Sequence, residues 1–438
     1  MKIQQNNLLH GAGDSCCKIA VIGGGVSGVV MAKMLSDFAD VTVFEGNDKI
    51  GGLVRCDQLP QGLYHKLGGH VFNTKSEEVS KWFWGNFDRD SEFFHLTRSA
   101  RILLDDTIIG YPIEDHLYQM DPVVSKAVIE DLLQLFRSGS PTAVNFKEFL
   151  MVTFGKTLCE RYFFPYNEKI WRCDLASIPL GWLEGKLPMP KIHDVMLSNF
   201  LRKEESTMVH SRFYYPKKGG SQFVVDRLAA GLDVRLGEPV SRLDRSADGR
   251  WMINGGSVGY DRVVYTGDIR RLDNVAGVFS DCPELRRLKS LKTRGITNAF
   301  CYCDTVSTSW LYLPEAKFKA NRIIYTGAFS PFNNGSERMT CVVEFVYGEE
   351  RENIADDLRR LPGNLELIAL NHVEDAYVIQ ESDTRDVVSG LKRSVQDRGL
   401  FLHGRFAEWE YYNIDKSIEM ALSTAAQVRQ SLGDEAMR

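Results

Sequence analysis

The chain has 438 residues, 44% of them hydrophobic and 25% charged, which is the composition of a folded globular protein and not of a disordered one. Its 53 Lys and Arg against 58 Asp and Glu give a formal net charge of −5, so there is no general positive field for nucleic acid or an anionic membrane. No apolar run approaches the ~18 residues of a membrane span, and nine cysteines without a C-x-x-C pair favour reduced thiols in a cytoplasmic protein.

The first predicted element is a polar leader over residues 1–17, which lacks the apolar stretch of a secretory signal. Residues 18–23, KIAVIG, form a short β-branched run that is typical of a buried parallel strand. Apolar residues at helical spacing follow over 29–38, and VTVFE at 41–45 predicts a second strand. Together these segments predict one β-α-β unit.

A glycine pattern joins the first strand of this unit to its helix. Gly23-x-Gly25-x-x-Gly28 is typical of dinucleotide binding when it stands between a strand and a helix. In such a motif Gly23 permits the tight turn, Gly25 lets the backbone approach a pyrophosphate, and Gly28 allows close helix packing. Glu45 ends the second strand, where its carboxylate would accept hydrogen bonds from ribose hydroxyls. We therefore predict a dinucleotide cofactor, and this motif alone admits both NAD and FAD.

Helical and strand-like segments occupy separate stretches of the remaining chain. Asp121–Pro122 starts an amphipathic helix, and further helical segments follow up to about residue 205. Strand-like runs resume at RFYYP, 212–216, and dominate until the last helix, near 416–431. This order predicts an α/β protein in which a helical insert interrupts the nucleotide-binding segments and an antiparallel sheet is added.

Two stretches favour FAD over NAD. Gly51-Gly52 is a second glycine pair close behind Glu45, and residues 237–268 have the pattern of a strand, a meander and a strand. With these features the sequence resembles the FAD-binding family that includes amine oxidases, protoporphyrinogen oxidase and UDP-galactopyranose mutase. In that family the second glycine turn lies against the ribityl and pyrophosphate part of FAD, so the resemblance implies FAD as the cofactor.

The resemblance also implies a Rossmann-type FAD-binding domain with a helical insert domain and an antiparallel-sheet substrate domain. After the leader, the expected boundaries are 18–75, 212–270 and 395–438 for the FAD-binding domain, 115–205 for the insert, and 76–114 with 285–394 for the sheet domain.

Four further stretches are similar to UDP-galactopyranose mutase in particular, and more to its eukaryotic form than to the shorter bacterial one. They are GGHVFN (68–73), PYNEKIW (165–171), WLYLPEAKFKANRIIYTGAFSP (310–331) and HGRFAEWEYYN (403–413), and YYPKKGGSQFVVDRLAAGL (214–232) adds a weaker fifth. They occur in matching order over most of the chain. The sequence therefore resembles a flavin-dependent mutase of sugar nucleotides.

What this resemblance implies is an isomerase that interconverts the pyranose and furanose forms of a nucleotide-diphosphate sugar, as in furanose biosynthesis. N5 of reduced FAD would attack the anomeric carbon as the nucleotide diphosphate leaves, giving a covalent flavin–sugar adduct. The sugar ring would then open, close through a different oxygen and take the diphosphate back. NAD(P)H is a candidate reductant, and a homo-oligomer is a candidate assembly. No nucleic acid and no membrane span are expected.

Motif matching assigns the site residues that the resemblance implies. The expected catalytic residues are His70 beside the isoalloxazine, Arg322 and Lys186 as a diphosphate clamp, and Arg405 near the flavin and sugar. The expected cofactor-binding residues are Gly23, Gly25, Gly28, Glu45, Gly51, Gly52, Gly69 and Asp415. The expected substrate-binding residues are Arg98, Tyr111, Glu114, Asn167, Trp171, Tyr312, Tyr377 and Tyr411. Cations and phenols of this kind are suited to holding a departing diphosphate.

Each of these residues also has a structural interpretation that stays open. His70 would then be a packed loop histidine, Lys186 a solvated lysine, and Trp171, Tyr377 and Tyr411 core residues. The rest of the histidines show no metal-ligand spacing, so no metal site is predicted.

Departures from the family's pattern concern the substrate. Lys186 replaces an arginine, which exchanges a planar fork for a point charge. Glu114 stands where the family has an amide beside uracil, and an ionised carboxylate only accepts hydrogen bonds. We therefore hypothesise a base with more donors than uracil, such as cytosine or guanine. Phe329 replaces a tyrosine of the eukaryotic form, so the sugar pocket is expected to differ.

Two other functions remain open at this point. An FAD-dependent oxidase or dehydrogenase of an amine or a specialised metabolite would share the FAD motifs without needing the diphosphate clamp. A relative that keeps FAD for structure and serves as a binding subunit is the third hypothesis, and the intact glycine fingerprint and the retained tyrosines argue against it.

Overall fold

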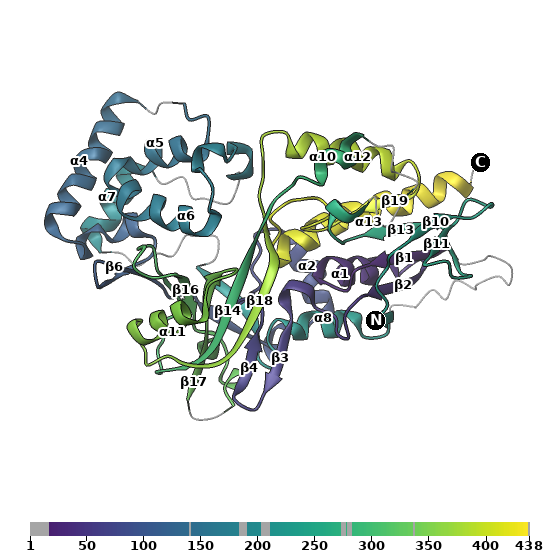
Figure 1. The fold of residues 1–438 in the computed structure, drawn as a ribbon, viewed down its shortest axis with the longest axis horizontal. Coiled ribbons are helices and arrows are strands. Elements are labelled where there is room, and N and C mark those ends of the chain that lie inside the picture. Colours follow the sequence, from purple (N-terminus) through teal and green to yellow (C-terminus); the bar gives the residue numbers. More distant parts are fainter. Residues whose placement is uncertain are drawn as a thin grey trace, which may run out of the picture.

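The computed structural model describes residues 17–139, 142–183, 191–202, 211–272, 277, 283–335 and 338–436. Three parts follow one another along its longest axis (Figure 1). The helical insert stands at one end, the sheet that contains β1 and β2 stands at the other, and a larger sheet built around β14 and β18 lies between them.

The first part contains a five-stranded parallel sheet in the order β19-β13-β1-β2-β9. Its strands are β1 (Lys18–Ile22), β2 (Asp40–Glu45), β9 (Asp233–Leu236), β13 (Arg262–Tyr265) and β19 (Leu400–Leu402). Alternate residues of β1 enter two different hydrophobic cores, Ile19 and Val21 on one face and Ala20 and Ile22 on the other. A parallel strand that is buried on both faces has the continuous apolar pattern seen in KIAVIG.

Helices cover both faces of this sheet. One core includes residues of α1 (Val26–Leu35), α8 (Gln222–Ala229) and α13 (Ile414–Ala436). The opposite core includes residues of α10 (Pro283–Leu288) and α12 (Thr384–Gln396) together with a small sheet of β10 (Leu243–Arg245), β11 (Trp251–Ile253) and β12 (Gly259–Tyr260). The expected doubly covered α/β arrangement of a dinucleotide-binding domain is therefore confirmed.

The middle part is a seven-stranded sheet in the order β18-β14-β17-β16-β15-β6-β7. Its strands are β6 (Ala100–Leu104), β7 (Thr107–Gly110), β14 (Thr293–Cys303), β15 (Trp310–Tyr312), β16 (Ala320–Ile324), β17 (Met339–Val346) and β18 (Glu366–Val378). Helix α11 (Arg351–Arg360) packs on one face through Ile354 and Leu358. Most neighbours are antiparallel as expected, but β15 and β6 pair parallel, and the β6–β7 hairpin extends the sheet at its edge.

The helical insert contains α4 (Pro122–Ser138), α5 (Phe146–Leu158), α6 (Phe164–Trp171) and α7 (Ile192–Leu201), with a π-helical turn over Cys159–Phe163. Asp121 caps α4 by accepting hydrogen bonds from the backbone N–H groups of Val123 and Val124, as the Asp-Pro start predicts. The insert shares one hydrophobic core with Tyr312 and Ile324 of the seven-stranded sheet. This shared core places α6 next to the β15–β16 hairpin.

Shorter elements connect these parts. They are η1 (Gly52–Val54), β3 (Cys56–Leu59), β4 (Gly62–His65), α2 (Glu77–Asn86), α3 (Arg89–Glu92), β5 (Phe93–Thr97), η2 (Ile113–Gln119) and β8 (Arg212–Pro216). Within the part of the chain that the structure describes, no helix is long and apolar enough to cross a bilayer. The expected leader, 1–17, lies outside the described residues except for its last position, and the domain boundaries stay a prediction.

Candidate active site

The first glycine motif forms a tight turn that leaves no room for a side chain at Gly23 or Gly28. Gly23 has φ +106°, a conformation that favours glycine. A Cβ atom on Gly28 would stand 1.8 Å from the Gly23 carbonyl oxygen. Gly25 is the N-cap of α1 and provides no side-chain cap, so the first N–H groups of this helix face outward. Such an N-terminus is suited to binding a pyrophosphate.

Glu45 ends β2 beside this turn and is buried. Its Oε2 atom accepts a hydrogen bond from the Gly24 N–H at 2.7 Å, and Oε1 accepts from the backbone N–H and side-chain amide of Asn47 at 2.9 and 2.5 Å. A carboxylate can accept about four hydrogen bonds, so these three leave capacity for a ribose hydroxyl. Glu45 also holds the glycine turn in place, a role that the sequence pattern does not indicate.

The second glycine turn lies directly against the first. The Gly51 N–H donates to the Gly24 carbonyl at 2.9 Å, and Gly25 and Gly51 form a parallel bridge. Gly51 has φ +130° and Gly52 has φ +51°, so both require glycine's conformational freedom. The two turns predicted from the sequence are therefore brought together, and the second one supplies Leu53 to the lining of the candidate cleft.

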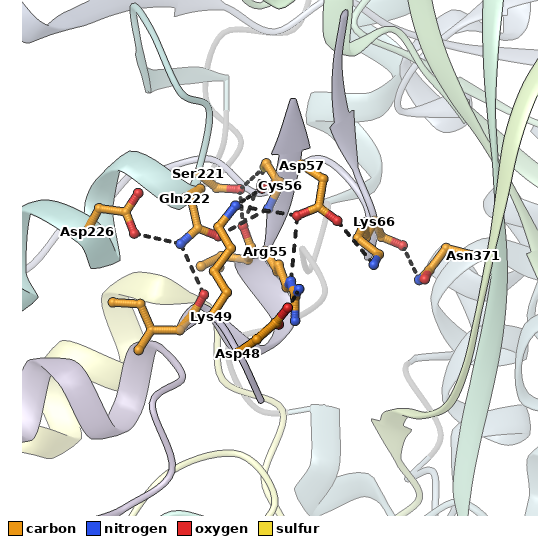
Figure 2. A network of polar contacts seen from close by, with 12 residues as sticks. Asp48, Lys49, Arg55, Cys56, Asp57, Lys66, Ser221, Gln222, Asp226 and Asn371 are labelled. Atoms are coloured by element: carbon orange, nitrogen blue, oxygen red, sulfur yellow. Dashed lines mark hydrogen bonds and ion pairs between the residues drawn. The ribbon is translucent and has the colours of Figure 1, made fainter. Parts of the chain in front are cut away.

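A network of polar side chains holds the residues on both sides of this second turn (Figure 2). The buried side chain of Gln222 donates from Nε2 to the Ile50 carbonyl at 3.0 Å and accepts from the Cys56 N–H at 3.3 Å. Lys49 donates to the Cys56 carbonyl at 2.6 Å, and Asp57 forms ion pairs with Lys49, Arg55 and Lys66 (Figure 2). Sequence reasoning missed Gln222, although it lies in the GGSQFVV stretch.

A cleft opens from the second glycine turn toward the seven-stranded sheet. Its walls come from the loop after β4, the residue after β5, strands β14 to β16 and β18, and the segment that leads into α13. The predicted residues that line it are Gly69, His70, Arg98, Tyr312, Arg322, Tyr377, Arg405 and Tyr411. Among its described lining residues three are arginines and none is acidic, so the cleft is suited to an anion with several charges.

Arg322, on β16, is held by Glu344 of β17 and Tyr377 of β18. Its Nη2 atom lies 2.8 Å from Glu344 Oε2 and 3.0 Å from the Tyr377 hydroxyl. Burial opposes the charge of Arg322, but Glu344 and the nearby tyrosines outweigh it and raise the pKa of the guanidinium well above its usual range. The Nε atom of Arg322 is buried and has no hydrogen-bond partner within the described part of the chain. The described part of the protein therefore leaves one N–H of Arg322 unsatisfied next to the cleft.

Arg98 follows β5 and lies beside Tyr312, the cross-strand neighbour of Arg322. Its Nη2 donates to the Tyr312 hydroxyl at 2.8 Å, and its guanidinium lies over the rings of Tyr111 and Trp310, 4.9 and 5.3 Å from their centroids. Burial, the neighbouring Tyr312 and the Glu114 charge raise the pKa of Tyr111, against the effect of Arg98. Tyr111 therefore stays a neutral phenol at physiological pH and supports Arg98 through its ring.

Arg405 follows β19 and is fixed by main-chain carbonyls. It donates to the carbonyls of Ala376 and Tyr412 at 3.0 and 2.6 Å, and it lies over the Tyr411 ring at 4.6 Å. The rings of Tyr411 and Tyr377 are stacked 5.9 Å apart. The Nε atom of Arg405 is buried and, like that of Arg322, finds no partner among the residues described. Arg405, Tyr411 and Tyr377 thus form one wall of the cleft.

His70 lies in the loop that links β4 to the cleft. Burial and the positive charges of Arg405 and Arg322 lower the pKa of His70 to about 3, so the imidazole is neutral at physiological pH. Its Nε2 atom is buried without a partner in the described chain. The structure therefore supports a neutral histidine that has one ring nitrogen left to contact a bound group.

Other predicted residues lie near the cleft without lining it. The amide of Asn167 in α6 donates to the carbonyl of Phe163 in the preceding π-helical turn, and the Trp171 ring packs edge-on against Tyr377. Glu114 is buried behind Tyr111. Asp415 is in the first turn of α13, directly after the lining residues Asn413 and Ile414, and burial raises the pKa of its carboxyl. Lys186 lies outside the described residues.

Phe329, which replaces an expected tyrosine, is fully buried. It packs against Phe213, Tyr215 and Trp310, so it shapes the wall behind the cleft and does not reach into it. Sequence reasoning also missed Glu344, the partner of Arg322, because an acidic residue in MTCVVEFVYG gives no sign of which residue the neighbouring strand places opposite it.

Comparisons with known proteins agree with this geometry. A profile of Rossmann-like NAD(P)-binding domains matches residues 21–85, and one of flavin-containing amine oxidoreductases matches residues 133–350. A crystal structure of reduced UDP-galactopyranose mutase superposes with a TM-score of 0.82 and 18% identity over 95% of this chain and 96% of that one. A putative protoporphyrinogen oxidase from Exiguobacterium sp. 255-15 superposes with a TM-score of 0.73 and 14% identity, covering 96% and 100%. The protein thus has the fold of FAD-binding amine oxidoreductases.

Two curated sequences that are similar to this chain are both named as sugar-nucleotide mutases. A probable UDP-galactopyranose mutase of Klebsiella pneumoniae is 25% identical over 177 residues, 39% of this chain and 45% of that protein. A dTDP-fucopyranose mutase of Escherichia coli is 24% identical over 180 residues, 39% of this chain and 46% of that protein. Each match covers less than half of the relative's length. The predicted resemblance to the sugar-nucleotide mutases is confirmed, and so is the predicted fold class.

The described residues fit FAD. A Cβ at Gly28 would occupy the space inside the first glycine turn. The N-terminus of α1 has no side-chain cap. Leu53, His70 and Ile414 line the neighbouring cleft. The amine oxidoreductase match and the fold support FAD as well. Within the described part of the chain, no group of His, Cys, Asp and Glu is arranged to hold a metal ion.

Proposed function

We propose that this protein is a flavin-dependent isomerase that interconverts the pyranose and furanose forms of a nucleotide-diphosphate sugar. The observation that carries the proposal is the convergence of Arg98, Arg322 and Arg405 in one cleft without a lining carboxylate. A cleft that only oxidised a neutral or cationic amine would not need three guanidinium groups. The names of the two curated relatives and of the superposed crystal structure of reduced UDP-galactopyranose mutase support the same class of substrate.

Reduced FAD, when bound, would supply a nucleophilic nitrogen, N5, for the anomeric carbon. The remaining work falls to the chain. Arg322 would donate a guanidinium N–H, and Tyr377 and Tyr411 their hydroxyls, to the diphosphate as it leaves, which stabilises the charge that develops on it. Arg98 and Tyr312 would contact the sugar nucleotide beside Arg322. Retention of the leaving diphosphate keeps it available for return to the same carbon.

His70 would serve the flavin side of the cleft. Because its imidazole is neutral at physiological pH, it can accept or donate one hydrogen bond at Nε2 without adding charge beside the flavin. Gly69 in front of it has no space for a Cβ, which would lie 2.7 Å from Ile324 Cγ2 and 2.9 Å from Phe329 Cε2. The loop that carries His70 is therefore fixed against the sheet.

The proposal predicts that turnover depends on the redox state of the cofactor. Anaerobic holoenzyme reduced with dithionite or NAD(P)H is expected to convert a sugar nucleotide at least about tenfold faster than the oxidised holoenzyme, because only reduced FAD offers a nucleophilic N5. Chromatography of the pyranose and furanose products measures both rates. Equal rates with oxidised and reduced enzyme would exclude this chemistry.

The second candidate function is an FAD-dependent oxidase or dehydrogenase, which the match to flavin-containing amine oxidoreductases favours. Anaerobic mixing with substrate separates the two. A substrate of an oxidase bleaches the oxidised flavin stoichiometrically, whereas a substrate of a mutase causes no net reduction. Bleaching by an amine, without conversion of any sugar nucleotide, would support the oxidase instead.

The nucleotide base is a finer part of the proposal. Glu114 does not line the cleft and is buried behind Tyr111, so only a base that extends past Tyr111 would meet its carboxylate, which accepts hydrogen bonds only. For such a base we expect CDP or GDP to bind the oxidised holoenzyme at least about tenfold more tightly than UDP or dTDP, a difference of about 1.4 kcal/mol. Titration of the four nucleotides, followed by flavin absorbance, measures this. The variant Glu114→Gln is expected to restore UDP binding, and a clear preference of the unmodified protein for UDP would refute the hypothesis.

A cytoplasmic location, NAD(P)H as reductant and a homo-oligomeric assembly belong to the same proposal. A cytoplasmic mutase would meet sugar nucleotides where nucleotide metabolism makes them. Sedimentation velocity of the holoenzyme determines the assembly, and anaerobic reduction rates with NADH and NADPH identify the reductant.

A further inference from the structure

Lys169 of α6 points its ammonium group into the turn between β15 and β16. The Nζ atom donates to the main-chain carbonyls of Leu313, Glu315 and Ala320 at 2.6, 2.8 and 3.2 Å. An ammonium has three N–H donors and no acceptor, so these three carbonyls match its full capacity. A side chain of the helical insert therefore closes a turn of the seven-stranded sheet.

A second side chain holds the same turn from the other side. Asp357 of α11 is 2% exposed, and its Oδ2 atom accepts hydrogen bonds from the N–H groups of Lys319 and Ala320 at 2.6 and 2.7 Å. Lys169 thus binds carbonyls of the turn, and Asp357 binds its N–H groups. Because the two residues come from different elements, the turn is fixed relative to both α6 and α11.

This turn begins next to two residues of the cleft. Tyr312 is the last residue of β15 and lies opposite Arg322 of β16. Leu313, whose carbonyl Lys169 binds, follows Tyr312 directly, and Ala320 stands two positions before Arg322. The Tyr312 ring also meets the Tyr166 ring of α6 edge-on, with centroids 5.6 Å apart. A displacement of the turn would therefore move the Tyr312 and Arg322 side chains together.

We propose that Lys169 is a positioning residue that aligns Tyr312 and Arg322 for the nucleotide diphosphate by fixing the β15–β16 turn to α6. The inference rests on the proposed function, because it assigns the alignment to diphosphate binding. Lys169 touches neither the cleft nor the predicted ligand. Its effect passes through main-chain carbonyls, and a shift of about 1 Å in a binding group can cost as much as 10²-fold.

Burial lowers the pKa of Lys169 to about 8, although Asp357 and Glu315 oppose this effect and Lys319 adds to it. Those three side chains are the charged groups that face it, from α11 and from the turn. Above this pH the amine keeps two N–H groups for three carbonyls and turns a lone pair toward one of them. The alignment is therefore expected to weaken between pH 7 and pH 9. Burial raises the pKa of Tyr377 in the cleft far above this window and lowers that of His70 to about 3.

The test compares Lys169→Met and Lys169→Arg with the unmodified holoenzyme. Lys156→Met serves as the matched control, because Lys156 is on the same insert with its side chain 68% exposed. UDP, CDP, GDP and dTDP are titrated into oxidised holoenzyme at pH 7 and pH 9, and FAD content is measured in each variant. Lys169→Met is expected to keep FAD. We expect it to bind the nucleotide that the unmodified holoenzyme prefers at least about tenfold more weakly than that holoenzyme does. The control is expected to be unchanged.

The pH comparison decides the question even if Lys169→Met does not fold. The unmodified protein is expected to bind its best nucleotide several-fold more weakly at pH 9 than at pH 7, whereas Lys169→Arg, whose guanidinium stays charged, is expected to show no such change. Identical pH profiles would overturn the inference, as would unchanged affinity in a folded Lys169→Met protein. An unmodified holoenzyme that binds none of the four nucleotides would overturn the proposed function itself, and this inference with it.

Discussion

Arg322→Ala is expected to lower kcat/KM for the sugar nucleotide by about 10²–10³-fold while FAD remains bound. Arg322 is a cleft cation that Glu344 and Tyr377 hold in position. Its removal takes away a charge-assisted donor from the leaving diphosphate and leaves the Glu344 carboxylate buried without its ion pair. An unpaired buried carboxylate would repel the anionic ligand as well. Steady-state kinetics on the reduced holoenzyme, with FAD content as a check, measures the loss.

Two further variants separate charge from geometry at this position. Arg322→Lys keeps the charge but not the planar fork, so we expect an intermediate loss, since one ammonium replaces donors that point in fixed directions. Arg359→Ala is the control, because the Arg359 side chain is 70% exposed and pairs with Asp356 on α11; little change is expected there. Wild-type kcat/KM in Arg322→Ala would show that the diphosphate is held elsewhere, and the proposed clamp would be wrong.

The sequence was most informative where one local pattern determines both structure and chemistry. Gly23, Gly25 and Gly28 lie within six residues, and Gly28 packs against the Gly23 carbonyl inside that stretch, so the turn could be predicted without knowing the rest of the fold. The second turn, at Gly51 and Gly52, could also be predicted, because this glycine pair follows the first motif closely in the sequence. The parallel sheet could be predicted equally well, since a continuously apolar strand must be covered on both faces.

The candidate site was harder to predict from the sequence, because its walls come from segments far apart in the chain. Arg98, Arg322 and Arg405 meet in one cleft, but no periodicity in the sequence indicates that they do; only the resemblance suggested it. Their supporting residues were out of reach for the same reason. Glu344 opposes Arg322 through strand register, and Lys169 binds a turn about 145 residues further along the chain. The parallel pairing of β15 with β6 is another long-range choice that local pattern does not determine.

Gly28→Ala is expected to abolish stable FAD binding, with an affinity at least about 100-fold lower, corresponding to about 3 kcal/mol. The added Cβ would stand 1.8 Å from the Gly23 carbonyl oxygen and 3.0 Å from its carbonyl carbon. Both are main-chain atoms, so the first turn of α1 must move away from β1. This movement would displace the N–H groups that are predicted to bind the pyrophosphate.

Gly85→Ala is the matched control for this substitution. Gly85 lies in α2, and a Cβ there would meet nothing within 4 Å. Alanine at such a helical position is expected to stabilise the protein by about 0.5–1 kcal/mol. Flavin absorbance after purification measures FAD retention, and thermal unfolding with and without added FAD separates loss of the cofactor from loss of the fold. If Gly28→Ala retained FAD as Gly85→Ala does, the cofactor could not be bound at this turn. The cleft would then need another explanation, because the flavin nitrogen on which the proposed isomerisation depends would no longer face Arg322.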